Sequence, residues 1–242
     1  MKRLLIDVGN TASKFALLED DELHHALTVL TKEVDNKIIK AVGTDYEEVV
    51  VSSVVPEINK TLSKIFKGKR IRYIVPSDNA GARINIDNPD ELGADLLCDI
   101  AGAIQLDEPL PALVVDLGTA TKFLYIDENK EFYSCAILPG LELALSSLSS
   151  GTALLPNVKV SGAKNILDCH NTIDVLTASG YYAAIDTING MVARYKRETG
   201  KEINVIVTGG YIDLLKKDFM FGYKHVPNLV LHGIAAIISR GE

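Results

Sequence analysis

The segment DVGNTASK, residues 7–14, places a carboxylate, a glycine, small polar side chains and a lysine close together. A glycine lets backbone N–H groups approach phosphate oxygens, and a lysine can bring a positive charge to a transferred phosphoryl group. Asp7 is suited to anchor a magnesium ion and its waters. The neutral donors are Asn10, Thr11 and Ser13, and the cation is Lys14. The segment predicts phosphate binding, although an ordinary β-hairpin with a Gly-Asn turn has the same pattern.

A second loop of this kind, DLGTAT at residues 116–121, strengthens the phosphate-binding interpretation. Two such loops at the ends of equivalent strands can hold phosphates from both sides, as a reaction governed by positioning and electrostatics requires. The motifs GxxxxGK[ST] and GxGxxG do not occur, so neither a P-loop nor a Rossmann site is predicted. Thr208, Gly209 and Gly210 form a third candidate loop, suited to adenosine, or a plain strand-to-helix turn.

Apolar runs separated by turn signals indicate the strands and helices that must position these loops. The predicted strands are residues 3–8, 15–19, 23–29, 49–53, 71–75, 112–116, 122–126, 131–137 and 205–208. The predicted helices are residues 56–66, 141–149, 173–199 and 229–239, one that starts near residues 88–91, and one through 214–215.

An internal repeat gives the domain organisation. LLIDVGNTASKFALLED, from Leu4, parallels ALVVDLGTATKFLYIDEN, from Ala112: an apolar strand, an aspartate, a glycine turn, and then Lys-Phe at the start of a second strand. Because such repeats mark duplicated architecture, we expect an α/β protein with two related lobes that have mixed sheets, residues 1–110 and 111–242. A nucleotide cleft is expected between the lobes.

Composition limits the classes of function. The 242 residues are 47% hydrophobic and 24% charged, which is typical of a globular protein, and the net charge of -7 argues against non-specific nucleic-acid binding. Apolar stretches fall far short of the roughly 20 residues of a membrane span. The N-terminus does not resemble a signal peptide, and Cys98, Cys135 and Cys169 lack metal-ligand spacing. We therefore expect a cytoplasmic protein with reduced thiols and a small-molecule substrate.

Several motifs, taken together in this order, resemble those of the type III pantothenate kinase family. They are DVGNTxxK at the start, NPxxxGAD at residues 88–95, DxGTAT at 116–121, ILPG followed by TALLP within 137–156, NT at 171–172 and a late TGG. The resemblance covers nearly the whole chain. It implies two ribonuclease-H-like lobes, as in acetate kinase, sugar kinases and actin, and ATP-dependent phosphorylation of pantothenate to 4'-phosphopantothenate, the first step of coenzyme A biosynthesis.

The resemblance also implies roles for individual residues and a homodimer. Asp95 would be the general base that accepts the proton of a primary hydroxyl, Asp7 would hold Mg²⁺, and Asp116 would hold a monovalent cation, K⁺ or NH₄⁺. The ATP-binding residues would be Asp7, Gly9, Asn10, Thr11, Ala12, Ser13, Lys14 and Thr119. The pantothenate-binding residues would be Ile86, Gly93, Ala94, Asp95, Leu96 and Thr172.

The chain departs from the family pattern around the acceptor. Leu96 stands where the family has an arginine, Ile86 where a tyrosine is usual, and Lys122 and Leu124 replace a threonine and an aspartate. An arginine binds a carboxylate bidentately and a leucine cannot. Lys122 is either a replacement cation or an exposed strand residue. Three hypotheses follow: an active pantothenate kinase, a nucleotide-binding or regulatory paralogue with impaired catalysis, and a kinase for another hydroxyl compound.

Overall fold

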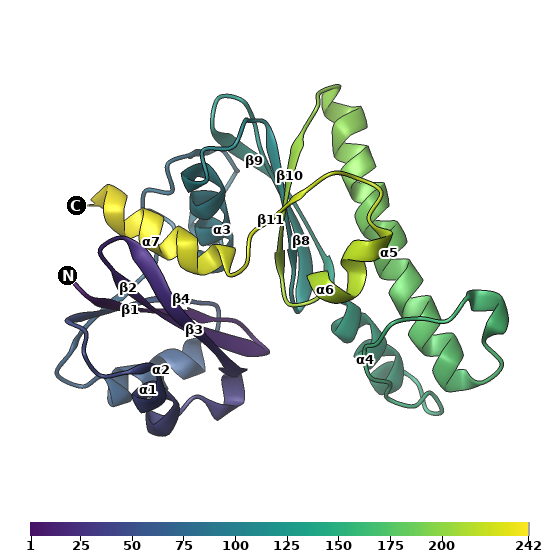
Figure 1. Cartoon of the computed structure of the whole chain (residues 1–242), viewed down its shortest axis with the longest axis horizontal. Coiled ribbons are helices and arrows are strands. Elements are labelled where there is room, and N and C mark those ends of the chain that lie inside the picture. Colours follow the sequence, from purple (N-terminus) through teal and green to yellow (C-terminus); the bar gives the residue numbers. More distant parts are fainter. Residues whose placement is uncertain (242) are drawn as a thin grey trace. The chain divides into compact units, whose positions relative to one another are not determined.

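The computed structural model describes residues 1–241, apart from the side chains of residues 25 and 26, and it divides into two compact units (Figure 1). The first unit contains residues 1–108 and 129–133 and the chain from Asn228 onward, and the second contains residues 109–128 and 134–227. The unit boundary near residue 108 lies close to the predicted lobe boundary, but the last helix packs in the first unit. The division into lobes at residue 110 stays a prediction.

The first unit is built on a five-stranded sheet in the order β3-β2-β1-β4-β5. β1 pairs antiparallel with β2 and parallel with β4. The strands are β1 (Arg3–Val8), β2 (Ala12–Glu19), β3 (Glu22–Leu30), β4 (Glu48–Ser53) and β5 (Arg70–Tyr73). On one face, the buried side chains of β1 and β4 pack with those of α1 (Asn36–Val42), of α2 (Pro56–Ile65) and of Phe66, which follows α2. Side chains alternate along a strand, so Leu4, Ile6 and Val8 lie on this face.

Two apolar helices, α3 (Ala94–Gln105) and α7 (Leu229–Gly241), contact each other and β4, and α7 also contacts β1. Glycines allow the two helices to approach closely. A Cβ atom on Gly233 would lie 1.8 Å from the backbone oxygen of Cys98, and one on Gly102 would lie 2.8 Å from the backbone oxygen of Leu229. The distance between α3 and α7 is therefore set by backbone atoms, which cannot move aside as a side chain can.

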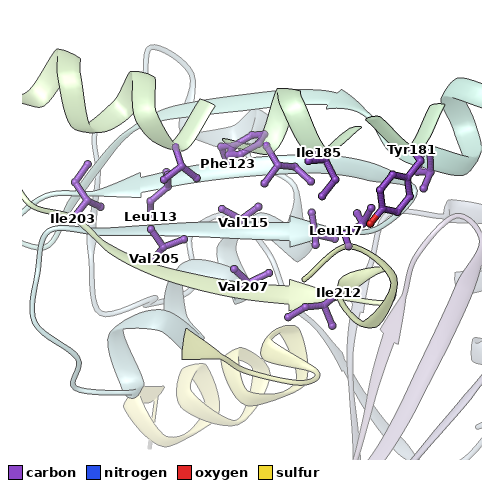
Figure 2. Packing of buried hydrophobic residues seen from close by; sticks show 14 of the residues in the cluster. Leu113, Val115, Leu117, Phe123, Tyr181, Ile185, Ile203, Val205, Val207 and Ile212 are labelled. Carbon is purple, nitrogen blue, oxygen red and sulfur yellow. The ribbon is translucent and has the colours of Figure 1, made fainter. Parts of the chain in front are cut away.

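The second unit repeats this sheet. Its strands are β7 (Ala112–Leu117), β8 (Ala120–Ile126), β9 (Glu131–Pro139), β10 (Asn204–Gly209) and β11 (Lys224–His225), and they lie in the order β11-β10-β7-β8-β9. The start of β9, residues 131–133, belongs to the first unit. β7 pairs antiparallel with β8 and parallel with β10. A core of side chains from β7, β8 and β10 packs against α4 (Leu141–Gly151), α5 (Thr172–Thr199) and α6 (Ile212–Leu215), and Figure 2 shows Leu113, Val115 and Leu117 in it.

The order β9-β8-β7-β10-β11 corresponds strand for strand to β3-β2-β1-β4-β5. The predicted α/β fold with two mixed sheets is confirmed. A short strand, β6 (Arg83–Ile84), pairs with the start of β9 and adds a sixth member to the second sheet. The 3-10 helices are η1 (Thr31–Glu33), η2 (Pro89–Glu91), η3 (Ile166–Asp168) and η4 (Lys216–Asp218).

The expected helix start at residues 88–91 was wrong. Pro89–Glu91 form only the single turn η2, and α3 begins at Ala94, after Gly93 adopts an extended backbone with ψ of 142°. The break fixes the position of Asp95 in the first turn of α3 rather than in its second. α1 was not predicted, although its cap is regular: the Asp35 side chain accepts hydrogen bonds from the backbone N–H groups of Lys37 and Ile38.

Two expectations from composition can be compared with residues 1–241. None of the described helices has both the length and the hydropathy that crossing a membrane requires. Cys98, Cys135 and Cys169 are all free thiols.

Candidate active site

The first candidate loop is the turn between β1 and β2, and hydrogen bonds close it tightly. The backbone N–H of Gly9 donates to the carbonyl oxygen of Ala12 at 3.1 Å. Thr31, which directly follows β3, makes two hydrogen bonds to the loop. Its backbone N–H donates to the carbonyl oxygen of Thr11 at 2.9 Å, and its hydroxyl donates to the carbonyl oxygen of Gly9 at 2.7 Å. Sequence reasoning missed Thr31, because nothing in a single sequence pairs it with residues 9–11.

Ser13 is a buried residue that helps to position the loop between β1 and β2 through a contact with Thr31. Its side chain is fully buried, and its hydroxyl lies 3.0 Å from the hydroxyl of Thr31. Asn10 and Thr11 are exposed, and Ala12 begins β2. The geometry gives Ser13 a loop-positioning contact, whereas its predicted contact with ATP stays a prediction.

Asp7 lies near the carboxyl end of β1, between two polar neighbours in register. Ser52 of β4 is its parallel partner and Lys14 of β2 is its antiparallel partner. Side-chain alternation puts Asp7 on the face of the sheet opposite Ile6 and Val8, which is the face that α3 and α7 contact. Within the described part of the chain, the half-buried Lys14 side chain makes no ion pair or hydrogen bond.

Three carboxylates, those of Asp7, Asp99 and Asp95 (the acidic cluster), act electrostatically on the buried thiol of Cys98. Burial raises the pKa of this thiol well above its usual value, and the negative charges of Asp7, Asp99 and Asp95 raise it further. Cys98 and Asp99 are both fully buried. The sequence-predicted residues Asp7, on β1, and Asp95, on α3, both lie within electrostatic range of Cys98. Asp99 and Cys98 were missed because helical spacing alone does not show which face of α3 meets the sheet.

Asp95 lies in the first turn of α3. Its Oδ1 atom accepts a hydrogen bond from the backbone N–H of Leu96 at 2.9 Å, and the partial positive charge of the helix N-terminus favours a carboxylate there. A Cβ atom on Gly93 would lie 2.6 Å from the same oxygen, so only glycine leaves room for this side-chain position. Asp95 is only partly buried, which leaves its carboxylate accessible to a substrate.

The second candidate loop joins β7 to β8 and closes in the same way as the first. The backbone N–H of Gly118 donates to the carbonyl oxygen of Ala120 at 3.1 Å. Gly140, in the ILPG motif, braces this loop: its N–H donates to the carbonyl oxygen of Thr119 at 2.9 Å, and a Cβ atom on Gly140 would lie 2.3 Å from the carbonyl oxygen of Gly118. The ILPG glycine is therefore needed for a close backbone approach.

Asp116 occupies the same position in the second sheet as Asp7 does in the first. Thr208 of β10 is its parallel partner and Lys122 of β8 its antiparallel partner. Here the lysine is paired: its Nζ atom lies 2.6 Å from Oδ2 of Asp116, and the two side chains are only 11% and 12% exposed. The interpretation of Lys122 as an exposed strand residue was wrong.

The Thr208-Gly209-Gly210 segment passes directly against the β7 end. Gly209 has a φ of 101°, and a Cβ atom on it would lie 2.5 Å from backbone atoms of Leu117. A glycine is required at position 209 because other residues disfavour this positive φ and because a side chain would collide with the backbone of Leu117. The segment does lead from a strand toward a helix, α6, and its predicted contact with adenosine stays a prediction.

The remaining predicted acceptor residues lie on separate elements. Ile86 follows β6 and is half-buried, as is Leu96 in α3. Thr172 is the exposed first residue of α5, whose cap is Asn171: the Asn171 side chain accepts a hydrogen bond from the backbone N–H of Asp174 at 3.0 Å. Their predicted contacts with pantothenate stay predictions.

Solved structures define the fold class. A Baf family protein from Campylobacter jejuni matches with a TM-score of 0.59 at 21% identity, covering 98% of each chain. Component A of (R)-2-hydroxyglutaryl-CoA dehydratase from Acidaminococcus fermentans matches with a TM-score of 0.55 at 14% identity, covering 100% of each chain. The archaeal actin homologue Ta0583 matches with a TM-score of 0.53 at 12% identity. The chain therefore has an actin-like fold.

Sequence comparison gives the family. The type III pantothenate kinase family model matches residues 3–194. Proteins named type III pantothenate kinase are 34% identical in Acholeplasma laidlawii, with 98% of each chain covered, and 30% identical in Brevibacillus brevis, with 99% covered. The chain belongs to the type III pantothenate kinase family.

Proposed function

We propose that the chain transfers the γ-phosphoryl group of ATP to the primary hydroxyl of pantothenate. Family membership, with a relative aligned over 98% of the chain, is the observation that carries the proposal. The duplicated hairpins support it on physical grounds, since each places a tight glycine loop beside an aspartate at the carboxyl end of a strand. Neither the family model nor the named relatives favour the nucleotide-binding paralogue without catalysis.

Within this proposal, Asp95 is the general base and Lys14 contacts the transferred phosphoryl group. A base needs an accessible acceptor atom in a fixed position, and the hydrogen bond from the Leu96 N–H holds the Asp95 carboxylate at the start of α3, where Gly93 leaves room for it. Lys14 is suited to a phosphate because its ammonium is not committed to a carboxylate within the described chain. Backbone N–H groups of the first loop supply further donors.

The residues near Asp7 fit a magnesium ion that arrives with ATP. Residues 1–241 contain no group of three or more His, Cys, Asp or Glu side chains arranged to hold a metal by themselves. Mg²⁺ in phosphoryl transfer typically uses one or two carboxylates together with phosphate oxygens and waters, so one buried aspartate suffices. Asp7 would hold the ion, which would neutralise charge on the phosphates.

The monovalent cation that the resemblance implies at Asp116 does not fit the residues present. The one carboxylate of Asp116 already contacts the ammonium of Lys122, and both side chains are largely buried. A second positive charge would have to enter this buried place, where Lys122 already neutralises the carboxylate of Asp116. No catalytic step is therefore assigned to a bound potassium ion.

The proposed reaction is tested with purified protein, ATP, Mg²⁺ and pantothenate. We expect ADP and 4'-phosphopantothenate in equal amounts, identified by mass spectrometry. Calorimetry with each substrate separately provides the decisive comparison, because Leu96 and Ile86 replace polar groups of the family pattern. Binding of ATP without binding of pantothenate, and without product, would contradict the proposal and favour the paralogue.

We also propose that the protein is a cytoplasmic homodimer. Free thiols at all three cysteines are typical of proteins in reducing compartments. Large apolar side chains are exposed on and between α4 and α5 of the second unit: Leu143, Leu148, Leu154, Ile166, Leu167, Ile173 and Val175. Such exposure supports an interface, and a second copy of this chain is the partner that the family implies.

A pair of charge substitutions tests the dimer. Leu143→Asp combined with Val175→Asp places carboxylates on α4 and α5, where the wild-type side chains are 44% and 45% exposed. We expect light scattering to give a mass of two chains for the wild type and of one chain for the variant. Met220→Asp, at a residue that is 84% exposed elsewhere in the second unit, should stay a dimer. A wild type that is monomeric at micromolar concentration would contradict the prediction.

A further inference from the structure

The two hairpins have equivalent aspartate–lysine positions but differ in what the lysine does. Asp7 faces Lys14 across β1 and β2, and Asp116 faces Lys122 across β7 and β8. Directly opposite residues in an antiparallel pair are close enough for their side chains to meet. Lys14 makes no ion pair within the described residues, whereas Lys122 contacts Asp116 at 2.6 Å.

The burial of β8 explains why Lys122 needs this partner. Every residue from Thr121 to Ile126 is buried, so both faces of the strand are covered, and the Lys122 side chain is only 11% exposed. A buried ammonium is costly unless it is paired and hydrogen-bonded. Asp116 is the matching negative charge in register on the next strand.

The ion pair lies at the base of the second loop. Both carboxylate oxygens of Asp116 are 3.9 Å from the position of a Cβ atom on Gly118, the first residue of the turn. Thr208, next to Asp116 on β10, is 2% exposed. A positive charge held at Asp116 is therefore immediately next to the backbone that would meet the nucleotide.

We propose that the Lys122 ammonium takes the place of a monovalent cation at Asp116, so that the enzyme works without K⁺ or NH₄⁺. The ε-ammonium of a lysine has the charge and donor groups of an ammonium ion but is attached to the chain. It keeps the carboxylate neutralised at any salt composition. The inference rests on the proposed function for the role of the loop, but the pairing itself can be tested without catalysis.

The first test measures thermal unfolding without substrates, in chloride salts of K⁺, NH₄⁺, Na⁺ and choline at equal ionic strength. The wild-type midpoint is expected to be the same in all four. Lys122→Ser removes the ammonium and leaves space at a buried carboxylate, so its midpoint should fall by about 10 °C in choline. K⁺ or NH₄⁺ should then raise the midpoint of this variant selectively.

Two further variants separate the effect of losing the Lys122 charge from the effect of opening space beside Asp116. Lys122→Met fills the volume of the lysine stem without its charge, so it should be destabilised in every salt, with no selective recovery in K⁺ or NH₄⁺. Lys216→Ser removes an equally short ion pair, since Nζ of Lys216 lies 2.6 Å from Oδ1 of Asp213, but that pair is exposed. This control should unfold like the wild type in all four salts.

The second test measures kcat/KM for ATP in the same salts. The wild type should have equal values in K⁺ and choline, and Lys122→Ser should gain at least about tenfold on addition of K⁺ or NH₄⁺. A wild-type unfolding midpoint or kcat/KM that rises selectively with K⁺ would overturn the inference. It would also be overturned if K⁺ and NH₄⁺ changed neither the unfolding midpoint nor kcat/KM of Lys122→Ser. A chain without kinase activity would contradict the proposed function alone, because the unfolding series still decides the pairing.

Discussion

Replacing Asp95 by asparagine is expected to lower kcat about 100-fold or more, which is the range that a general base contributes. The amide has nearly the shape of the carboxylate but cannot accept the proton of the attacking hydroxyl. The loss should appear in kcat, measured by steady-state kinetics at saturating ATP and pantothenate. Because the side chain lies at the start of α3 and is only partly buried, the fold should survive the change.

Asp90→Asn is the matched control for this prediction. Asp90 is exposed, lies in the single turn η2 and is outside the acidic cluster around Cys98. The same chemical change there should leave kcat within about twofold, as expected of a surface substitution. An Asp95→Asn enzyme that keeps wild-type kcat with an unchanged unfolding midpoint would remove Asp95 as the base.

Gly233→Ala is expected to destabilise the protein by about 3 kcal/mol, at the upper end of what overpacking costs. The added methyl group would lie 1.8 Å from the backbone oxygen of Cys98, so α3 or α7 must shift. A shift of α3 would also displace Asp95, and kcat should fall although Gly233 is not a proposed substrate contact. Chemical denaturation gives the free energy of unfolding, and the kinetic assay gives the second effect.

Gly190→Ala provides the opposite expectation in another helix. Gly190 is an exposed residue of α5, and a Cβ atom there would have no neighbouring atom within 4 Å. Alanine should therefore stabilise the protein by up to about 1 kcal/mol, because glycine is the poorer helix residue. If both alanine variants behaved alike, the close contact between α3 and α7 would not be a determinant of stability.

The sequence was sufficient to predict most of the fold because its signals are local. The apolar runs, the turn glycines and the repeated Asp-x-Gly unit mark the strands and their duplication, and the strand orders confirm it. The error at residues 88–91 is also local in origin. Pro89 with two acidic residues has the composition of a helix start, but Gly93 interrupts the helix before α3.

The site was predictable only in part because it depends on contacts between distant segments. Motifs predict Asp7 and Asp95, but their shared electrostatic effect on Cys98 depends on which face of α3 meets β4. Thr31 and Gly140 support loops that are far from them in the sequence. Because the strand that contains Lys122 is buried on both faces, its sequence pattern does not show the direction of the Lys122 side chain. The role of Lys122 could therefore not be predicted before its partner was known.

The place of α7 has a consequence for the order in which the chain folds during translation. α7, which packs on α3, leaves the ribosome after the central part of the chain, which forms most of the second unit. The second unit can therefore gain its structure while the first, although synthesised earlier, still exposes the apolar face of α3. A nascent chain shortened before residue 229 keeps that face open and is a natural substrate for chaperones.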